Sequence, residues 1–167
     1  MEPEGSEQVQ NMLTSGSYTI VSAKDNLPIG RRANEDKSLH PKRVYALPPE
    51  EAGQNSVWQL EFRGDSSYIL KCNGAPTVAH ESHVWAVLTD DEEPTVWKVI
   101  KRGPGSGGGY TIVNKNDPIG AGWVVSILEA HDDKPIAVRP LIVFPTFPAT
   151  YPNTELFVFK EIKEEDQ

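Results

Sequence analysis

The most constraining feature of this 167-residue chain is an internal repeat. Residues 17–21 (Ser-Tyr-Thr-Ile-Val) are followed by residues 26–30 (Asn-Leu-Pro-Ile-Gly), and residues 109–113 (Gly-Tyr-Thr-Ile-Val) are followed by residues 116–120 (Asn-Asp-Pro-Ile-Gly). A weaker copy begins at Tyr68. A pattern that recurs in one chain is typical of a structural unit that cannot bury its own apolar face and must pack against its copies. The sequence therefore predicts three related units around a shared core.

Short apolar stretches separated by proline and glycine predict an all-β chain. The sequence contains 14 prolines and 13 glycines, and no window keeps the helical spacing of apolar residues over three turns. Four strands can be placed in each unit. The twelve predicted strands cover residues 18–23, 28–32, 43–47 and 57–62 in the first unit, 68–72, 77–79, 84–88 and 96–100 in the second, and 110–114, 121–125, 136–139 and 156–159 in the third.

Each predicted unit also closes with an aromatic residue, at Trp58, Trp97 and Phe157. Three four-stranded units whose apolar residues face a common axis predict a β-trefoil, in which six strands close a pseudo-threefold symmetric barrel and three hairpins cap it. A two-sheet sandwich is the alternative. Since a sandwich needs no threefold repeat, the trefoil is favoured.

A single β-trefoil domain is predicted for residues 16–162. Residues 1–15 are polar and lack periodicity, and residues 163–167 are charged, so both are expected to be flexible tails. The net charge of −8 argues against a nucleic-acid or anionic-membrane surface, which would need clustered Lys and Arg. With one cysteine, Cys72, and no signal peptide or long apolar span, the sequence predicts a soluble cytoplasmic monomer without a disulfide.

No pattern of catalytic or metal-binding residues emerges, so neither an enzyme nor a cofactor is expected. His80 and His83 flank Glu81, but histidines three apart on a short β-connection do not share a face as they would on a helix. Cys72 lies in no Cys-His signature and is expected to be a small apolar filler. More distant candidates complete no second metal cluster: His40, His131, Asp132 and Asp133.

Sugar binding is a second function to weigh, because trefoils often bind sugars through a Gln-x-Trp element in each unit. The corresponding positions here are residues 56–58, 95–97 and 155–157, and all three lack the glutamine. The aromatic residues at these positions are therefore predicted to lie in the core. A carbohydrate-binding trefoil and an interaction scaffold stay open as alternatives.

The most distinctive segment is a charged loop between the second and third strands of the first unit. Residues 30–44 contain Gly-Arg, Glu-Asp-Lys-Ser-Leu and Pro-Lys-Arg elements. Together with residues 18–20, 140–143 and 155–157, this segment resembles the mushroom β-trefoil serine protease inhibitors of the cospin and cnispin group. The resemblance covers about residues 16–162.

The resemblance implies tight, reversible inhibition of trypsin-like serine proteases by one exposed loop, without a cofactor. In cospin-like members the reactive loop joins strands two and three of the first unit, which corresponds here to residues 33–42. In cnispin-like members it lies instead in the last long loop, but no Lys or Arg occurs between Pro140 and Thr154 of this chain. The resemblance therefore points to residues 33–42.

The residues of this loop support the same assignment on chemical grounds. A trypsin-like specificity pocket has a carboxylate at its base, so an inhibitor must insert one long cationic side chain while its backbone pairs with the cleft as an added strand. Lys37 supplies the cation and Ser38 the small residue after it, and Leu39 can fill the next apolar subsite. Pro41 is expected to stiffen the loop by fixing its φ angle.

Four further residues complete the predicted site. Glu35 and Asp36 are expected to accept hydrogen bonds from backbone amides and so hold the loop open. Arg31 and Arg32 are the alternatives to Lys37, although their place beside a strand favours side-chain stems that lie on the barrel. A solvated charged loop with no partner is the remaining interpretation.

A smaller hypothesis concerns Asn73 in the turn between the first two strands of the second unit. Related mushroom trefoil inhibitors of cysteine proteases use an asparagine in such a loop against asparagine-specific endopeptidases. The resemblance thus implies a second protease class as a partner for Asn73. Asn-Gly is also the commonest tight hairpin turn, and that interpretation is favoured.

Overall fold

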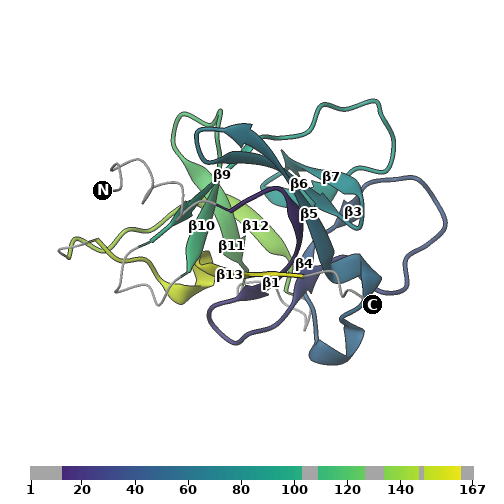
Figure 1. Cartoon of the computed structure of the whole chain (residues 1–167), viewed down its shortest axis with the longest axis horizontal. Helices are drawn as coiled ribbons and strands as arrows, with labels where there is room; N and C mark the ends of the chain where they lie inside the picture. The colour runs from purple at the N-terminus through teal and green to yellow at the C-terminus, as the bar shows by residue number, and fades with distance from the viewer. Residues whose placement is uncertain (1–12, 103–108, 127–133, 147–148, 163–167) are drawn as a thin grey trace, which may run out of the picture.

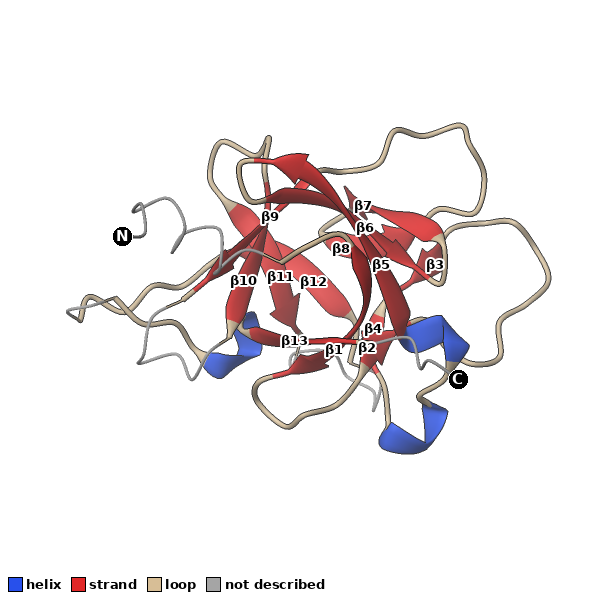
Figure 2. Cartoon of the chain, viewed as in Figure 1, coloured by secondary structure: helices blue, strands red, loops and turns tan. Residues whose placement is uncertain are grey.

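The computed structural model describes residues 13–102, 109–126, 134–146 and 149–162. Within these ranges the regular structure is strand, apart from three single-turn 3-10 helices (Figure 2). None of the described helices is long or apolar enough to cross a membrane. The predicted all-β class is therefore confirmed.

All twelve predicted strands are present, one of them split in two. The strands are β1 (Gly16–Ser22), β2 (Ile29–Gly30), β3 (Lys42–Arg43), β4 (Tyr45–Ala46), β5 (Val57–Gly64), β6 (Ser67–Cys72), β7 (Ala75–His80), β8 (His83–Ala86), β9 (Trp97–Lys101), β10 (Tyr110–Asn114), β11 (Ala121–Val125), β12 (Ile136–Pro140) and β13 (Phe157–Glu161). The 3-10 helices are η1 (Pro49–Glu51), η2 (Gln54–Ser56) and η4 (Asn153–Glu155).

Six of the strands pair in a closed circuit (Figure 1). Strand β1 pairs with β13 and β5, β5 with β6, β6 with β9, β9 with β10, and β10 with β13, all antiparallel. Because every strand of the circuit has a partner on both sides, none of the six is an exposed edge. Three further antiparallel pairs, β2–β4, β7–β8 and β11–β12, lie outside the circuit.

One strand prediction is wrong, because residues 43–47 do not form a single strand. Strand β3 pairs with β8, whereas β4 pairs with β2. Val44 separates the two, and its backbone N–H donates to the carbonyl of Val84 (3.2 Å). The split fixes the end of the preceding loop, residues 31–41, against the β7–β8 hairpin.

The core centres on four aromatic side chains that are fully buried. Trp58, Trp97 and Phe157 surround Trp123 of β11, with ring centroids 5.5, 5.6 and 5.7 Å from it. The first three are the closing aromatics that the sequence predicts as core, and their complete burial confirms that prediction. Fully burying side chains of this size is a large hydrophobic gain, so this cluster is a principal stabilising contact of the core.

The fold extends further toward the N-terminus than predicted. The Tyr68 hydroxyl donates to the carbonyl of Leu13 (2.5 Å), and the Tyr18 hydroxyl donates to the carbonyl of Thr14 (2.8 Å). The Ser15 hydroxyl accepts the backbone N–H of Phe62 (2.9 Å). The predicted tail of residues 1–15 therefore needs correction, because at least its last three residues bind the barrel.

The aromatic cluster gives a first prediction. Replacing Trp123 with Ala should lower the free energy of unfolding by about 3–5 kcal/mol, since it leaves a cavity among three side chains that cannot all collapse into it. Urea denaturation followed by circular dichroism measures the change. Ile119→Ala is the control: Ile119 is 70% exposed, so its loss should cost no more than about 0.5 kcal/mol. Equal stability of the two variants would contradict the role given to Trp123.

Candidate functional site

The charged loop of residues 31–41 leaves β2 and returns to the barrel at β3. It extends well beyond the strands, next to the loop that follows β8 (Figure 1). Gly30, immediately before the loop, lies so close to η2 that a Cβ atom there would be 2.4 Å from the carbonyl oxygen of Asn55. Only glycine therefore lets the loop start flat against the 3-10 helix.

Arg31 anchors the first limb of the loop from the inside. Its side chain is buried, and its guanidinium donates to both carboxylate oxygens of Glu35 (2.9 and 2.7 Å) and to the carbonyl of Cys72 (3.1 Å). Bidentate pairs of this kind are geometrically specific and stronger than neutral hydrogen bonds. In this conformation Arg31 offers no charge to a partner protein, and Glu35 binds a side chain rather than the backbone amides predicted for it.

Arg32 is tied to the surface of the barrel. Its guanidinium donates to Glu51 (3.0 Å) and lies over the ring of Tyr45, 4.9 Å from the centroid. The carbonyl of Arg32 accepts a hydrogen bond from the side-chain amide of Asn55 (2.8 Å), and Glu51 also accepts the backbone N–H of Ala33 (3.1 Å). These four contacts add to those of Arg31 and hold the first limb in place before the tip begins.

A compact group of three side chains braces the second limb. Asp36 Oδ1 accepts hydrogen bonds from the backbone N–H of Ser38 (2.9 Å), the Ser38 hydroxyl (2.6 Å) and the Lys42 ammonium (2.5 Å). Lys42 Nζ also lies 3.2 Å from Ser38 Oγ. We call this group the Asp36–Ser38–Lys42 brace. It confirms that Asp36 accepts a backbone amide inside the loop.

The tip of the loop presents two residues that are not part of the brace. Lys37 lies between Asp36 and Ser38, and Leu39 follows Ser38. Lys37 is exposed, and it makes no hydrogen bond or ion pair with any other residue of the described ranges. Leu39 is 65% exposed. Contacts therefore alternate along the tip: Asp36, whose side chain is 74% exposed, and Ser38 bind Lys42, whereas Lys37 and Leu39 face solvent.

The positive charge of Lys42 stabilises the ionised form of Asp36. Hydrogen bonding from the Lys42 ammonium, and then from the Ser38 side chain and backbone, holds the pKa of Asp36 well below its usual range. Since opposite charges and hydrogen-bond donors favour the ionised form, Asp36 is a carboxylate at every physiological pH. Its negative charge is directed at Lys42 and away from Lys37.

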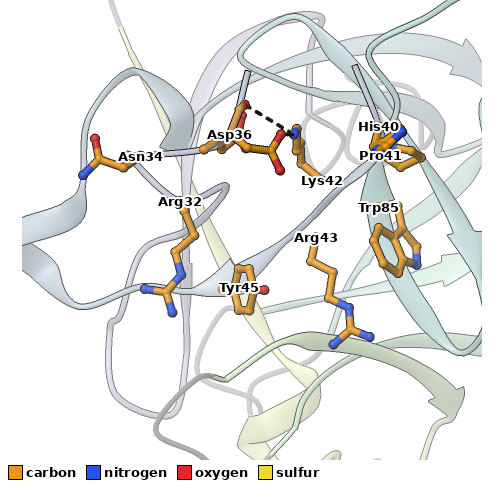
Figure 3. Close-up of a pocket in the computed structure, with 10 residues that line it drawn as sticks. Arg32, Asn34, Asp36, His40, Pro41, Lys42, Arg43, Tyr45 and Trp85 are labelled. Atoms are coloured by element: carbon orange, nitrogen blue, oxygen red, sulfur yellow. Dashed lines mark hydrogen bonds and ion pairs between the residues drawn. The ribbon is translucent and has the colours of Figure 1, made fainter. Parts of the chain in front are cut away.

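A cavity of about 440 Å³ separates the loop from the barrel surface beneath it (Figure 3). Tyr45 and Trp85 form part of its wall, and Arg43 lies over the ring of Trp85, 5.0 Å from the centroid. In the close-up, Arg32 and Arg43 point the same way on either side of Tyr45, while Asp36 and Lys42 meet above them. The middle of the loop is therefore separated from the barrel by this cavity, while its limbs and the brace hold it in place.

The structure gives Asn73 a structural role. Asn73 and Gly74 have φ angles of 50° and 84°, as a tight hairpin turn between β6 and β7 requires. The side-chain amide of Asn73 donates to Asn55 Oδ1 (2.8 Å). The favoured interpretation of Asn73 as a turn residue accounts for its geometry.

The other reactive side chains do not assemble into a site. His80 Nε2 is 3.8 Å from Glu81, but no group of three or more His, Cys, Asp or Glu residues in the described part of the chain could hold a metal ion. Burial raises the pKa of the Cys72 thiol to about 12, so this thiol stays protonated and unreactive. His131, Asp132 and Asp133 lie outside the described residues.

A second exposed loop follows β12 and is bound by a buried carboxylate, that of Glu155 in η4. Ile142 and Phe144 are 57% and 43% exposed, whereas Glu155 is buried. Glu155 Oε2 accepts the backbone N–H of Ile142 (2.7 Å), and its Oε1 has no hydrogen-bond partner among the described residues. Burial accordingly raises the pKa of Glu155.

Comparison with known proteins defines the class of this chain. A serine protease inhibitor of Lentinula edodes is 37% identical over 145 residues, which make up 87% of this chain and 95% of the relative. A proteinase inhibitor from Coprinopsis cinerea is also 37% identical, and its solved structure matches with a TM-score of 0.79 over 90% of this chain and 99% of that chain. Both relatives are protease inhibitors, not enzymes.

The family model for peptidase inhibitor I66 matches residues 11–161. The chain belongs to the peptidase inhibitor I66 family, and the resemblance to fungal protease inhibitors is thereby confirmed. A designed threefold symmetric protein, ThreeFoil, matches with a TM-score of 0.63 over 88% of this chain and 99% of that chain. At 16% identity, this last likeness concerns the fold alone.

The brace predicts an abnormal titration of Asp36. Because its folded-state pKa lies below the ordinary 3.8, the ionised brace persists at higher pH and is lost only as the pH falls through the lowered pKa. Carboxyl-carbon NMR should show this low midpoint in the wild type and a rise toward the ordinary value in Lys42→Met. As control, Lys71→Met should raise the pKa of its own partner, Glu61, and leave Asp36 unchanged. An ordinary midpoint for wild-type Asp36 would contradict the brace.

Glu155 predicts the opposite dependence on pH. Its folded-state pKa is raised, so its contribution to stability is complete below about pH 4.5 and is lost as the pH rises through the raised pKa. Glu155→Gln is neutral at every pH and can still accept the Ile142 N–H. The stability of this variant relative to wild type should therefore increase across that pH window in urea denaturation. A difference that does not change with pH would show that Glu155 titrates normally.

Proposed function

We propose that the chain is a reversible, substrate-like inhibitor of trypsin-like serine proteases, and that residues 33–42 enter the protease active site with Lys37 in the specificity pocket. One observation carries the proposal. Lys37 is exposed and unpaired with other described residues, between two neighbours that bind Lys42. The loop thus offers a single long cation at its tip.

The chemistry of the pocket explains why a lysine at this position suffices. A buried carboxylate at the base of a trypsin-like pocket gains a partner only when a long cationic side chain reaches it, and a charge left unpaired there is costly. Lys37 breaks no hydrogen bond or ion pair with the described residues when it inserts, because it makes none. Leu39, also exposed, lies two residues on, where it can contact an apolar subsite.

A tight inhibitor also needs a loop whose shape is fixed before contact, and the limbs of the loop provide this. A loop that is ordered in advance loses little conformational entropy on docking, so a contact of about 1,600 Å² can give nanomolar affinity. The Arg31–Glu35 pair fixes one limb and Lys42 the other. A backbone held in this way can pair with the protease cleft as an added strand.

Neither arginine is as well placed as Lys37 to enter a pocket. Arg31 is 7% exposed and would have to break its bidentate pair with Glu35. Arg32 would have to leave Glu51 and the ring of Tyr45. Lys37 is therefore the specificity residue that we propose.

We also infer that the scaffold is a β-trefoil. The closed circuit of six strands and the three hairpin pairs outside it are the elements that this fold requires. The likeness to a designed threefold symmetric protein supports the same inference. Sugar binding of the Gln-x-Trp kind finds no support, since Trp58, Trp97 and Phe157 are wholly buried.

The proposal predicts the result of a trypsin titration. Lys37→Ala should weaken inhibition by at least about 2 kcal/mol, or about 30-fold in the inhibition constant, because it leaves the pocket carboxylate without a partner. Lys37→Arg should retain inhibition, because arginine is also a long cation. The inhibition constants come from residual trypsin activity at increasing inhibitor concentration.

Lys101→Ala serves as the control, because Lys101 is an exposed lysine on the barrel strand β9. This variant should inhibit trypsin as the wild type does. Unchanged inhibition by Lys37→Ala would exclude Lys37 as the specificity residue. A wild-type protein that does not inhibit trypsin would exclude the trypsin-like target altogether.

A further inference from the structure

We propose that Asp36 and Lys42 hold the new amino group of Ser38 in place after a bound protease opens the Lys37–Ser38 bond, so that the bond is re-formed rather than hydrolysed. The inference rests on the proposed function, because it takes Lys37 as the residue in the specificity pocket. Asp36 and Lys42 act through Ser38, and both are therefore positioning residues. Their role is to make the loop an inhibitor rather than a substrate.

Two hydrogen bonds join Asp36 to Ser38 across the bond in question. Asp36 Oδ1 accepts the backbone N–H of Ser38 (2.9 Å) and the Ser38 hydroxyl (2.6 Å). The backbone nitrogen of Ser38 is the atom that would leave if the Lys37–Ser38 bond opened. The carboxylate therefore already binds the leaving group in the intact loop.

Lys42 fixes both partners from a rigid position. Its ammonium lies 2.5 Å from Asp36 Oδ1, 3.5 Å from the Asp36 carbonyl oxygen and 3.2 Å from Ser38 Oγ. The Lys42 side chain is only 10% exposed, and its backbone pairs with Ala86 of β8. One cation thus contacts groups on either side of the Lys37–Ser38 bond, and Figure 3 shows it directed at Asp36.

The contact of Asp36 with the Ser38 nitrogen affects whether a serine protease hydrolyses the loop or re-forms the bond. The attacking serine oxygen bonds to the Lys37 carbonyl carbon, and the Ser38 nitrogen leaves as an amine with a proton from the protease histidine. From a substrate this amine departs, and water then hydrolyses the acyl-enzyme. An amine that stays beside the acyl carbon can instead attack it, return the proton to the histidine and release the serine. That cycle consumes nothing, whereas hydrolysis consumes one water.

The limbs of the loop keep both sides of an opened bond on the barrel. On the amino side, Glu35 is two residues from Lys37 and is paired with the buried Arg31. On the carboxyl side, Lys42 belongs to β3. Because neither end can move far, the amine stays at a high effective concentration near the acyl carbon.

The first test is the rate of hydrolysis by catalytic amounts of trypsin. Mass spectrometry follows opening of the Lys37–Ser38 bond through the mass of the added water. We expect the wild type to reach a stable mixture of intact and opened inhibitor, and Asp36→Ala and Lys42→Met to be hydrolysed to completion at least about tenfold faster. Lys71→Met is the matched control: it removes a lysine paired with Glu61 at 3.2 Å on the barrel and should behave as wild type.

Re-formation of the bond is the sharper readout, because a role in loop stability alone would not change it. When trypsin is added to purified opened inhibitor, intact chain should reappear for the wild type and for Lys42→Arg, but not for Lys42→Met. If Lys42→Met is resealed as well as the wild type, the inference is wrong while the proposed function stands. If the wild type does not inhibit trypsin, or is opened at another bond, both are wrong.

Discussion

The packing of Trp123 against Trp58, Trp97 and Phe157 is the interaction on which the rest of the structure depends. The three surrounding residues begin or lie near the start of strands in the closed circuit, so their contact with one central ring holds that circuit together. The indole N–H of Trp58 donates to the carbonyl of Ile29 (2.8 Å), which ties β2 to the same core. The charged loop therefore leaves the barrel from a strand that is anchored at its centre.

The charged side chains of the loop fall into two groups. Arg31, Glu35 and Lys42 are turned inward or covered and serve the loop itself, whereas Lys37 alone is left to solvent without a described partner. Asp36, an acid beside the proposed specificity residue Lys37, would be unfavourable in a trypsin substrate. In this loop its charge is matched by Lys42, and its hydrogen bond to Ser38 makes it an element of the proposed inhibition.

The repeat in the sequence predicts the strands and the closing aromatics, because both follow from local alternation of apolar residues. It does not predict that Trp123, on a hairpin strand, fills the centre, since only the assembled barrel defines that space. Nor does the repeat predict that Arg31 is buried whereas Lys37 is exposed. Arg31 is buried where it meets Glu35, four residues on, and the carbonyl of Cys72, 41 residues on. Only the folded chain brings Cys72 to this point.

The brace is likewise a product of tertiary structure. Lys42 is six residues from Asp36 and four from Ser38, and the pairing of β3 with β8 fixes the backbone from which its side chain reaches them. A crystal structure of the wild type bound to trypsin tests the account most directly. We expect the Lys37 ammonium to lie at the carboxylate of the specificity pocket, with the brace intact beside the catalytic serine. A different side chain in the pocket, or trypsin bound away from residues 33–42, would contradict it.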